Sequence, residues 1–148
     1  MNPSTPSRTP SAELLTRLIL TIFQVNGQLL AAGDRLTKNL GLTSALWQVL
    51  GAVKETPLTV AQIARNMGLT RQSVRRSAHV LKDRGFVELQ DNPHHQRAKL
   101  VVLTREGRTV LDQVAAVQAE WSNRMAEGLA TEKLQTTIQT LGRLGERL

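Results

Sequence analysis

Cysteine and tyrosine are absent from this chain of 148 residues, which contains only two Phe and two Trp. Without cysteine there can be no disulfide, thiolate metal site, thiol nucleophile or cysteine redox switch. The few aromatic rings leave little capacity for stacking on a ligand. No 18 apolar residues run together, because Thr, Arg, Gln and Asn interrupt the richest stretch, Leu14 to Leu30. We therefore expect no membrane span and a cytoplasmic protein.

The motifs of several enzyme classes are absent as well. There is no Walker or dinucleotide glycine pattern, no His-Glu-x-x-His and no Gly-x-Ser-x-Gly. The carboxylates are dispersed along the chain and form no catalytic pair. We expect neither an enzyme nor a cofactor.

Length and composition indicate one domain. Hydrophobic residues make up 41% and charged residues 21% of the chain, as in an ordinary globular protein. Met1 to Ser11 hold three Pro, two Thr and three Ser before any apolar periodicity begins. We expect residues 1–10 to form a flexible arm and residues 11–148 to form a single domain.

Apolar residues recur at helical spacing through most of the chain. From Ser11, which we expect to cap the first helix, a stripe of Leu, Ile and Phe runs to Leu30. A short second helix is expected to start at Thr43, a long helix after Thr104 and a last helix at Thr131.

Two capped segments in the middle of the chain predict a helix-turn-helix. Thr59 and Gln62 fit a capping box, and Gly68 suits the end of that helix. Thr70 caps the next helix, which Gly85 ends. The β-prone runs that follow, 86–89 and 98–103, flank a polar turn and predict a two-stranded hairpin. The expected fold class is mainly α with a small β-hairpin.

The second of these two helices has the composition of a helix that reads DNA. When Val74 faces the core, polar side chains occupy the opposite face or its shoulder. The residues expected to contact DNA are Thr70, Arg71, Gln72, Ser73, Arg75, Arg76 and His79. In the major groove Arg can bond bidentately to guanine and Gln to adenine, while Thr and Ser near the helix start reach phosphates. A solvated basic helix face is the alternative.

Positive charge concentrates in the same part of the chain. Residues 65–108 hold ten Lys or Arg and four Asp or Glu, which is +6 of the total formal charge of +7. Such a patch predicts DNA affinity that falls steeply with salt. In the hairpin, His95, Arg97 and Lys99 are further candidates for DNA contact, with Arg97 placed to enter a narrow minor groove. An exposed loop Arg is the alternative, and the adjacent His pair lacks the further ligands of a metal site.

Four segments resemble the MarR family of bacterial transcription regulators. They are Leu42 to Leu50, Leu58 to Ala64, Thr70 to Val74 and Arg97 to Gly107. The resemblance implies a winged helix-turn-helix lobe at 42–104, with dimerisation helices at 11–40 and 105–148. It also implies a homodimer that binds a roughly palindromic operator on double-stranded DNA, usually as a repressor released by a small ligand. The lack of cysteine excludes the branch of the family that senses peroxides through that residue.

One position departs from the family's pattern. The family's wing often has Asp-x-Arg, in which the Asp holds the wing Arg, whereas this chain has His95-Gln96-Arg97. The usual ion pair cannot form in the same way. Either Asp91 substitutes for the missing carboxylate or the wing is less ordered, and the sequence leaves both open.

Two further expectations concern partners. The apolar stripes at residues 14–30 and 131–148 are too long for a small core to cover, which predicts a second copy of the chain; packing within one chain is the alternative. The resemblance places a ligand pocket between the dimerisation helices and the DNA-binding lobe. There, Phe23 and Trp47 are expected to approach a small aromatic or anionic ligand, although both also fit simple core packing.

Two other functions remain open at this level. A winged helix can serve as a protein-interaction module, which predicts an acidic or apolar recognition face, whereas residues 71–76 carry three Arg. A ligand-independent architectural DNA-binding protein is the other alternative. Operator selectivity and release by a ligand would separate it from a sensor.

Overall fold

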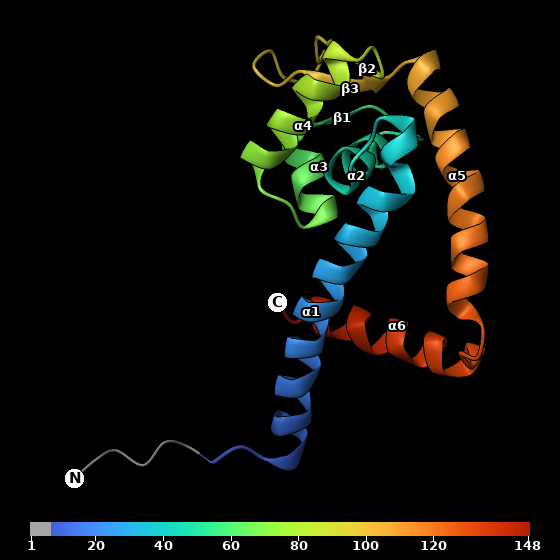
Figure 1. Ribbon diagram of the computed structural model, residues 1–148. Helices are drawn as coiled ribbons and strands as arrows, with labels where there is room; N and C mark the ends of the chain where they lie inside the picture. The colour runs from blue at the N-terminus through green and yellow to red at the C-terminus, as the bar shows by residue number, and fades with distance from the viewer. Residues whose placement is uncertain (1–6) are drawn as a thin grey trace. The chain divides into compact units, whose positions relative to one another are not determined.

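The computed structural model describes residues 7–148, which begin with a long helix (Figure 1). Helix α1 (Pro10–Thr37) is followed by a short 3-10 helix, η1 (Lys38–Leu40). The side chain of Thr9 caps α1 by accepting a hydrogen bond from the backbone N–H of Ala12 at 3.2 Å, so the expectation that Ser11 is the cap was wrong. Proline suits a helix start because the N–H it lacks would be unpaired there. Residues 1–6 of the expected arm lie outside the described residues.

Three short helices follow α1 and η1 and form the centre of one lobe. They are α2 (Ser44–Ala52), α3 (Val60–Met67) and α4 (Arg71–Asp83). The predicted capping box is confirmed, because Thr59 Oγ1 accepts from the N–H of Gln62 at 3.3 Å and Gln62 Oε1 accepts from the N–H of Thr59 at 2.8 Å. Gly68 follows α3 with a φ of +64°, a left-handed conformation that glycine adopts without steric cost.

The sheet has three strands, one more than the sequence predicts. Strand β3 (Leu100–Leu103) lies in the middle and pairs antiparallel with β2 (Val87–Gln90) and with β1 (Leu58–Thr59). The expectation of only two strands was therefore wrong. Strand β1 has just two residues, and the second of them, Thr59, also caps α3. The sequence around Thr59 therefore predicts a helix start and gives no sign that Thr59 pairs with β3.

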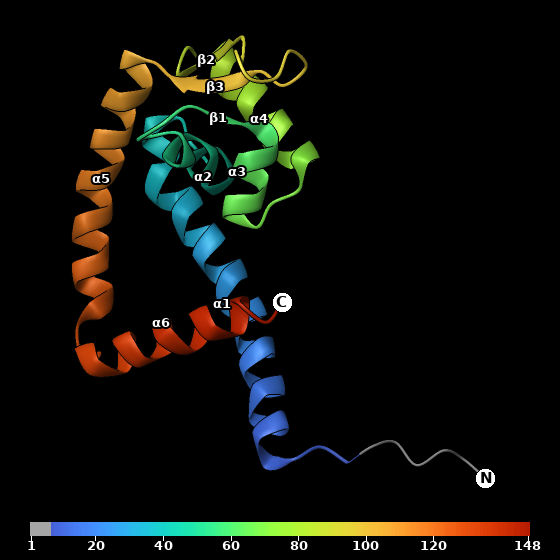
Figure 2. The same ribbon diagram turned by 180° about the vertical axis from the view of Figure 1, so that it is seen from behind.

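Side chains from the helices and from the sheet pack together in one hydrophobic core. Val49 and Leu50 of α2, Ile63 of α3, Leu81 of α4 and Val101 of β3 all have an exposed fraction of 0%. Val74, which we expected to face the core, is buried in it together with Ala78 and Leu81 of α4. Figures 1 and 2 both show the sheet on the side of the lobe away from the N-terminal half of α1. The core thus fixes α4 and the hairpin as parts of one rigid body.

Two helices complete the chain. Thr104 Oγ1 accepts from the N–H of Gly107 at 3.0 Å at the start of α5 (Arg105–Ala126), as predicted, and Leu111 and Val114 of that helix are buried in the core. Helix α6 (Thr131–Gly145) follows and has no buried residue. The chain divides into two compact units, residues 1–114 and residues 115–148.

Replacing Gly107 by Ala is expected to destabilise the lobe. A Cβ at this position would lie 2.1 Å from the carbonyl oxygen of Phe86 and 2.8 Å from Leu103 Cδ1, so backbone must shift. Overpacking of this kind costs about 1–3 kcal/mol of unfolding free energy, which denaturant unfolding at fixed protein concentration measures.

A matched control is Gly51→Ala, because a Cβ there meets nothing within 4 Å. This variant should unfold at the same denaturant concentration as the wild type or at a higher one. Equal stability of the two variants would contradict the close approach of α5 to Phe86.

Candidate nucleic-acid interface

Helix α4 presents a row of polar side chains to solvent. Val74 and Leu81 have an exposed fraction of 0%, which orients the helix on the core. The predicted DNA-contacting residues of this helix and its cap are all exposed: Thr70, Arg71, Gln72, Ser73, Arg75, Arg76 and His79. Each residue that the sequence predicted for the recognition helix is therefore accessible to a binding partner.

Two of these residues also define the start of the helix. Thr70 Oγ1 accepts from the N–H of Ser73 at 3.1 Å, and Ser73 Oγ donates to the carbonyl oxygen of Thr70 at 2.9 Å. The cap uses one lone pair of the Thr70 hydroxyl and leaves its proton free to donate to an anion. Both hydroxyls thus stay at the helix start, where exposed N–H groups and the helix dipole attract phosphate.

The wing consists of β2, β3 and the turn at 91–99 between them. At its base Lys99 Nζ donates to Asp91 Oδ1 at 2.5 Å. The hydrogen bond from Lys99, and then its positive charge, lower the pKa of Asp91 below its usual value. The carboxylate therefore remains ionised at neutral pH, and the pair is lost only when the pH falls through this lowered pKa.

The ion pair between Lys99 and Asp91 shows whether Asp91 takes the place of the carboxylate that the wing lacks at His95. Asp91 does not replace His95 as the partner of Arg97, because it holds Lys99 instead. Among residues 7–148 the guanidinium of Arg97 has no ion-pair partner. His95 is exposed in the turn, which is held by backbone hydrogen bonds from His95 to Asn92 and from Ala98 to His95, both at 3.2 Å.

The recognition helix and the wing meet at a hollow of about 300 Å³. Arg75 and His79 reach it from α4, and Arg97 and Lys99 reach it from the wing. Figure 1 shows the turn between β2 and β3 beside α4. Side chains more than 15 residues apart in sequence therefore form one cationic site, a juxtaposition that no local sequence pattern reveals.

Two basic residues of the positively charged segment serve the fold. The guanidinium of Arg84, just after α4, donates to the carbonyl oxygen of Gly41. Arg108 of α5 donates to the carbonyl oxygen of Lys54 at 3.0 Å. Charge counting alone missed these structural roles, so the basic segment overstates the number of cations available to DNA.

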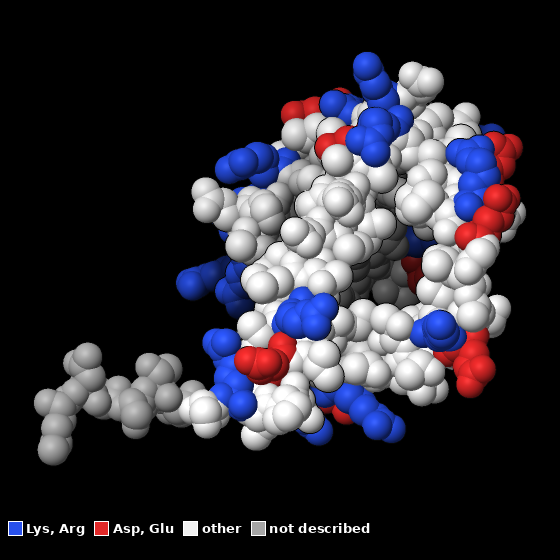
Figure 3. Space-filling view, turned by 60° about the horizontal axis from the view of Figure 1, so that its bottom comes forward, with Lys and Arg blue, Asp and Glu red and all other residues white. Residues whose placement is uncertain are grey.

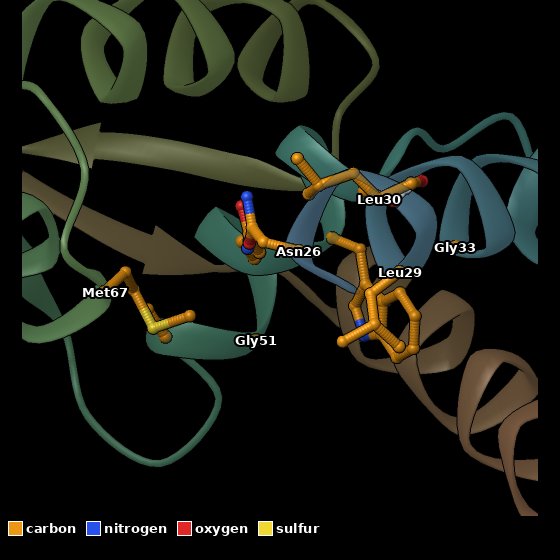
Figure 4. A pocket seen from close by; sticks show the side chains of 10 residues that line it. Asn26, Leu29, Leu30, Gly33, Gly51 and Met67 are labelled. Atoms are coloured by element: carbon orange, nitrogen blue, oxygen red, sulfur yellow. Dashed lines mark hydrogen bonds between the residues drawn. The ribbon is translucent and has the colours of Figure 1, made fainter. Parts of the chain in front are cut away.

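The two aromatic residues predicted for a ligand pocket lie in different surroundings. Trp47 lines a cavity of about 450 Å³, whereas Phe23 is not among its lining residues and is 69% exposed. Figure 4 shows Leu29, Leu30 and Asn26 of α1 on one side of this cavity and Met67 of α3 on the other. No sequence signal marked Met67 as a lining residue.

A tight helix crossing forms one wall of the cavity. Ser44 Oγ donates to the carbonyl oxygen of Leu30 at 2.6 Å, and the N–H of Ser44 donates to Asp34 Oδ1 at 2.7 Å. A Cβ on Gly33 would lie 2.3 Å from Ser44 Oγ, so only glycine allows this approach. These bonds fix the start of α2 on α1.

No group of three or more His, Asp or Glu within residues 7–148 is placed to hold a metal ion. A helix-turn-helix, a wing formed by the β2–β3 hairpin and an exposed cationic helix α4 are together the features of a winged-helix DNA-binding protein.

Comparisons with known proteins agree with this class. The model of the MarR family matches residues 40–98. The uncharacterized protein Rv2011c of Mycobacterium tuberculosis is 38% identical over 130 residues, which are 88% of this chain and 91% of that protein. The transcriptional activatory protein BadR of Rhodopseudomonas palustris is 29% identical over 107 residues, 70% of this chain and 61% of BadR. The chain belongs to the MarR family of DNA-binding transcription regulators.

Solved structures share the fold. The transcriptional regulator BldR of Sulfolobus solfataricus superposes with a TM-score of 0.85 at 21% identity, covering 95% of this chain and all of BldR. CouR of Rhodococcus jostii RHA1, bound to p-coumaroyl-CoA, gives 0.76 at 25% identity and covers 86% of this chain and 90% of CouR. MosR of M. tuberculosis, in complex with DNA, has a TM-score of 0.72 at 22% identity. The match covers 87% of this chain and 96% of MosR. The predicted winged-helix fold is confirmed.

Proposed function

We propose that this protein is a homodimeric transcription regulator. It represses transcription when bound to a palindromic operator, and binding of a small ligand releases it from that operator. The observation that carries the proposal is the set of exposed polar side chains on α4, Gln72 and Arg76 among them, in the same compact unit as Arg97. Arg97 has no ion-pair partner among residues 7–148. MosR, whose structure is a complex with DNA, shares the fold and supports this use of the lobe. Repression is the expected sign, although the name of BadR describes an activator.

A second copy of the chain is the proposed cover for the apolar helix surfaces. On α1, Leu20 is 59% and Phe23 69% exposed, and on α6 Ile138 is 70% exposed. Figure 3 shows a broad white area, the colour of all residues other than Lys, Arg, Asp and Glu, with blue and red side chains scattered on it and around it. Exposed apolar surface on this scale in both units favours an obligate interface between copies.

Helix α1 with η1, over Pro10–Leu40, is long and apolar enough to cross a membrane by length and composition alone. However, Glu13, Arg17, Gln24, Gln28 and Arg35 recur along one face of this helix. A polar stripe along the whole length suits a helix with one face on a protein partner and one in water, whereas a lone spanning helix would bury charge in lipid. We therefore propose a protein interface here and a cytoplasmic location.

The 450 Å³ cavity is the proposed ligand site, and its lining indicates an uncharged ligand. It is lined by Asn26, Leu29, Leu30, Gly33, Ser44, Trp47, Gln48, Gly51, Ala52 and Met67. None of these side chains carries a charge, so the carboxylate of an anionic ligand would lose its water shell without a cationic partner. Asn26 and Gln48 supply amide groups that can orient one polar group of an apolar molecule. CouR, which has the same fold, is bound to p-coumaroyl-CoA.

Trp47 provides a direct signal for this site. In a Trp121→Phe background Trp47 is the remaining tryptophan, and neutral aromatic amides such as benzamide should shift its emission saturably. Matched carboxylates such as benzoate should bind at least about tenfold more weakly, because desolvating the anion is uncompensated.

The control for the ligand site is Gly51→Leu, since a side chain at Gly51 meets open space and would fill the cavity. This variant should lose the emission change and keep its affinity for DNA. Stronger binding of the carboxylates, or an unaltered response in Gly51→Leu, would contradict an uncharged ligand in this cavity.

Selection of binding sites from a random duplex pool tests the proposed function itself. A homodimer with two α4 helices should enrich an inverted repeat whose half-sites are centred about 34 Å apart along the duplex. Enrichment of no sequence would favour an architectural protein, and enrichment of a single unrepeated site would reject the dimeric mode. Transcription from a promoter that carries the selected site should fall when the protein is added and recover when the ligand is added. A rise in transcription on addition of the protein would show an activator and contradict repression.

A further inference from the structure

The hollow between α4 and the wing combines positive charge with an apolar floor. Four of its lining residues, Arg75, His79, Arg97 and Lys99, are exposed, and the other four are buried or half-buried. Its other lining residues are Val60, Ala78, Leu89 and Ala98, none of which has a polar side chain. All eight belong to the unit of residues 1–114, so the site does not depend on how the two units are arranged.

The position of Arg75 on α4 differs from that of its neighbour Arg76. At about 100° per residue, Arg76 lies about 200° around the helix from the buried Val74, so it points away from the core. Gln72 lies two residues before Val74 and shares that outer face. Arg75 is only about 100° from Val74 and lines the hollow, which Gln72 and Arg76 do not. Arg75 therefore leans toward the wing.

Two arginine residues that line this hollow have no counter-ion among residues 7–148. Lys99 is paired with Asp91, whereas Arg75 and Arg97 have no ion-pair partner among residues 7–148. Two cations that line one small hollow repel each other unless an anion lies between them. A phosphodiester supplies one negative charge and oxygen acceptors for both guanidinium groups, and its deoxyribose supplies carbon atoms for the apolar floor.

We propose that this hollow holds one sugar-phosphate unit of the DNA strand that separates the major groove at α4 from the minor groove at the wing. Arg75 and Arg97 bind the same phosphate, and Arg75 reads no base. Base reading from α4 is thereby left to residues on the outer face such as Gln72 and Arg76. This inference rests on the proposed function. It assigns Arg75 a role different from the base contact that its residue type predicts, and it gives Arg97 a phosphate contact in place of the minor-groove entry expected from the sequence.

The test compares Arg75→Ala with the wild type on the selected operator and on scrambled DNA over a range of salt concentrations. Arg75→Ala should lose about 3- to 10-fold in affinity on both duplexes and lower the salt slope by about one, because one phosphate contact is removed. Arg124→Ala, which removes the same charge in the other unit, should leave affinity on both duplexes nearly unchanged.

Operators with a single uncharged methylphosphonate locate the phosphate. At one position in each half-site, the neutral linkage should weaken binding of the wild-type protein. On that duplex Arg75→Ala and Arg97→Ala should bind no more weakly than the wild type does. The double variant on the normal operator should then lose less affinity than the product of the two single losses, since both side chains act on one group.

Two results would overturn the inference. One is a changed base preference in Arg75→Ala, and the other is an effect of Arg75→Ala that persists on every methylphosphonate duplex. Failure of the wild type to distinguish operator from scrambled DNA would instead reject the proposed function.

Discussion

Ile138→Glu is expected to convert the protein from a dimer to a monomer and to abolish tight operator binding. Ile138 is 70% exposed on α6, so the substitution leaves the fold of one chain intact. In an interface between copies it would bury two unpaired carboxylates, one from each chain, at a cost of several kcal/mol. Sedimentation equilibrium should show the chain mass of 16.3 kDa in place of twice that value.

The matched control is Gln139→Glu, which adds the same charge one residue further along α6. Gln139 lies about 100° around the helix from Ile138, away from the stripe of Leu134, Ile138 and Leu141. This variant should remain a dimer. Operator affinity should fall by about 100-fold or more in Ile138→Glu alone, because a monomer contacts one half-site. A monomeric wild type, or a dimeric Ile138→Glu, would contradict the proposed interface.

Arg76→Ala is expected to remove discrimination at one base step of each half-site. Arg76 is exposed on the outer face of α4 and has no ion-pair partner among residues 7–148, so its loss should not affect folding. A bidentate contact between Arg and guanine is worth about 1–3 kcal/mol of discrimination, which corresponds to roughly 5- to 150-fold in affinity. Titration of operators that carry each of the four base pairs at that step measures it.

Arg76→Lys separates base reading from charge. Lysine keeps the positive charge and lacks the planar fork of the guanidinium, so discrimination should fall while the salt slope remains. Unchanged base preference in both variants would show that α4 does not read the major groove through Arg76.

The parts of the fold that depend on local signals were predicted well from the sequence. The caps at Thr59, Thr70 and Thr104 and the left-handed Gly68 follow from residue types a few positions apart, and the structure confirms them. Thr9 displaced Ser11 as the cap of α1 because the following Pro10 favours the first helical turn. Strand β1 was not predicted because its two residues form a strand only through their pairing with β3.

Candidate DNA contacts could be proposed from the sequence one residue at a time, but their arrangement in space could not. The composition of α4 and of the wing identified the candidate DNA contacts, yet the hollow shared by Arg75 and Arg97 depends on tertiary packing. The pairing of Asp91 with Lys99 depends on the register of the hairpin, which spacing alone did not give. Phe23 and Trp47 differ because Gly33 and Ser44 set the crossing of α1 and α2 beside Trp47.

The most direct test of the account is a binding titration of the purified protein on its own upstream intergenic DNA and on scrambled DNA at several salt concentrations. A sequence-specific regulator should bind the upstream fragment at least about 10³-fold more tightly than the scrambled one, and its affinity for both should fall steeply as salt rises. Equal affinity for both duplexes, or no binding to either, would contradict a sequence-specific regulator.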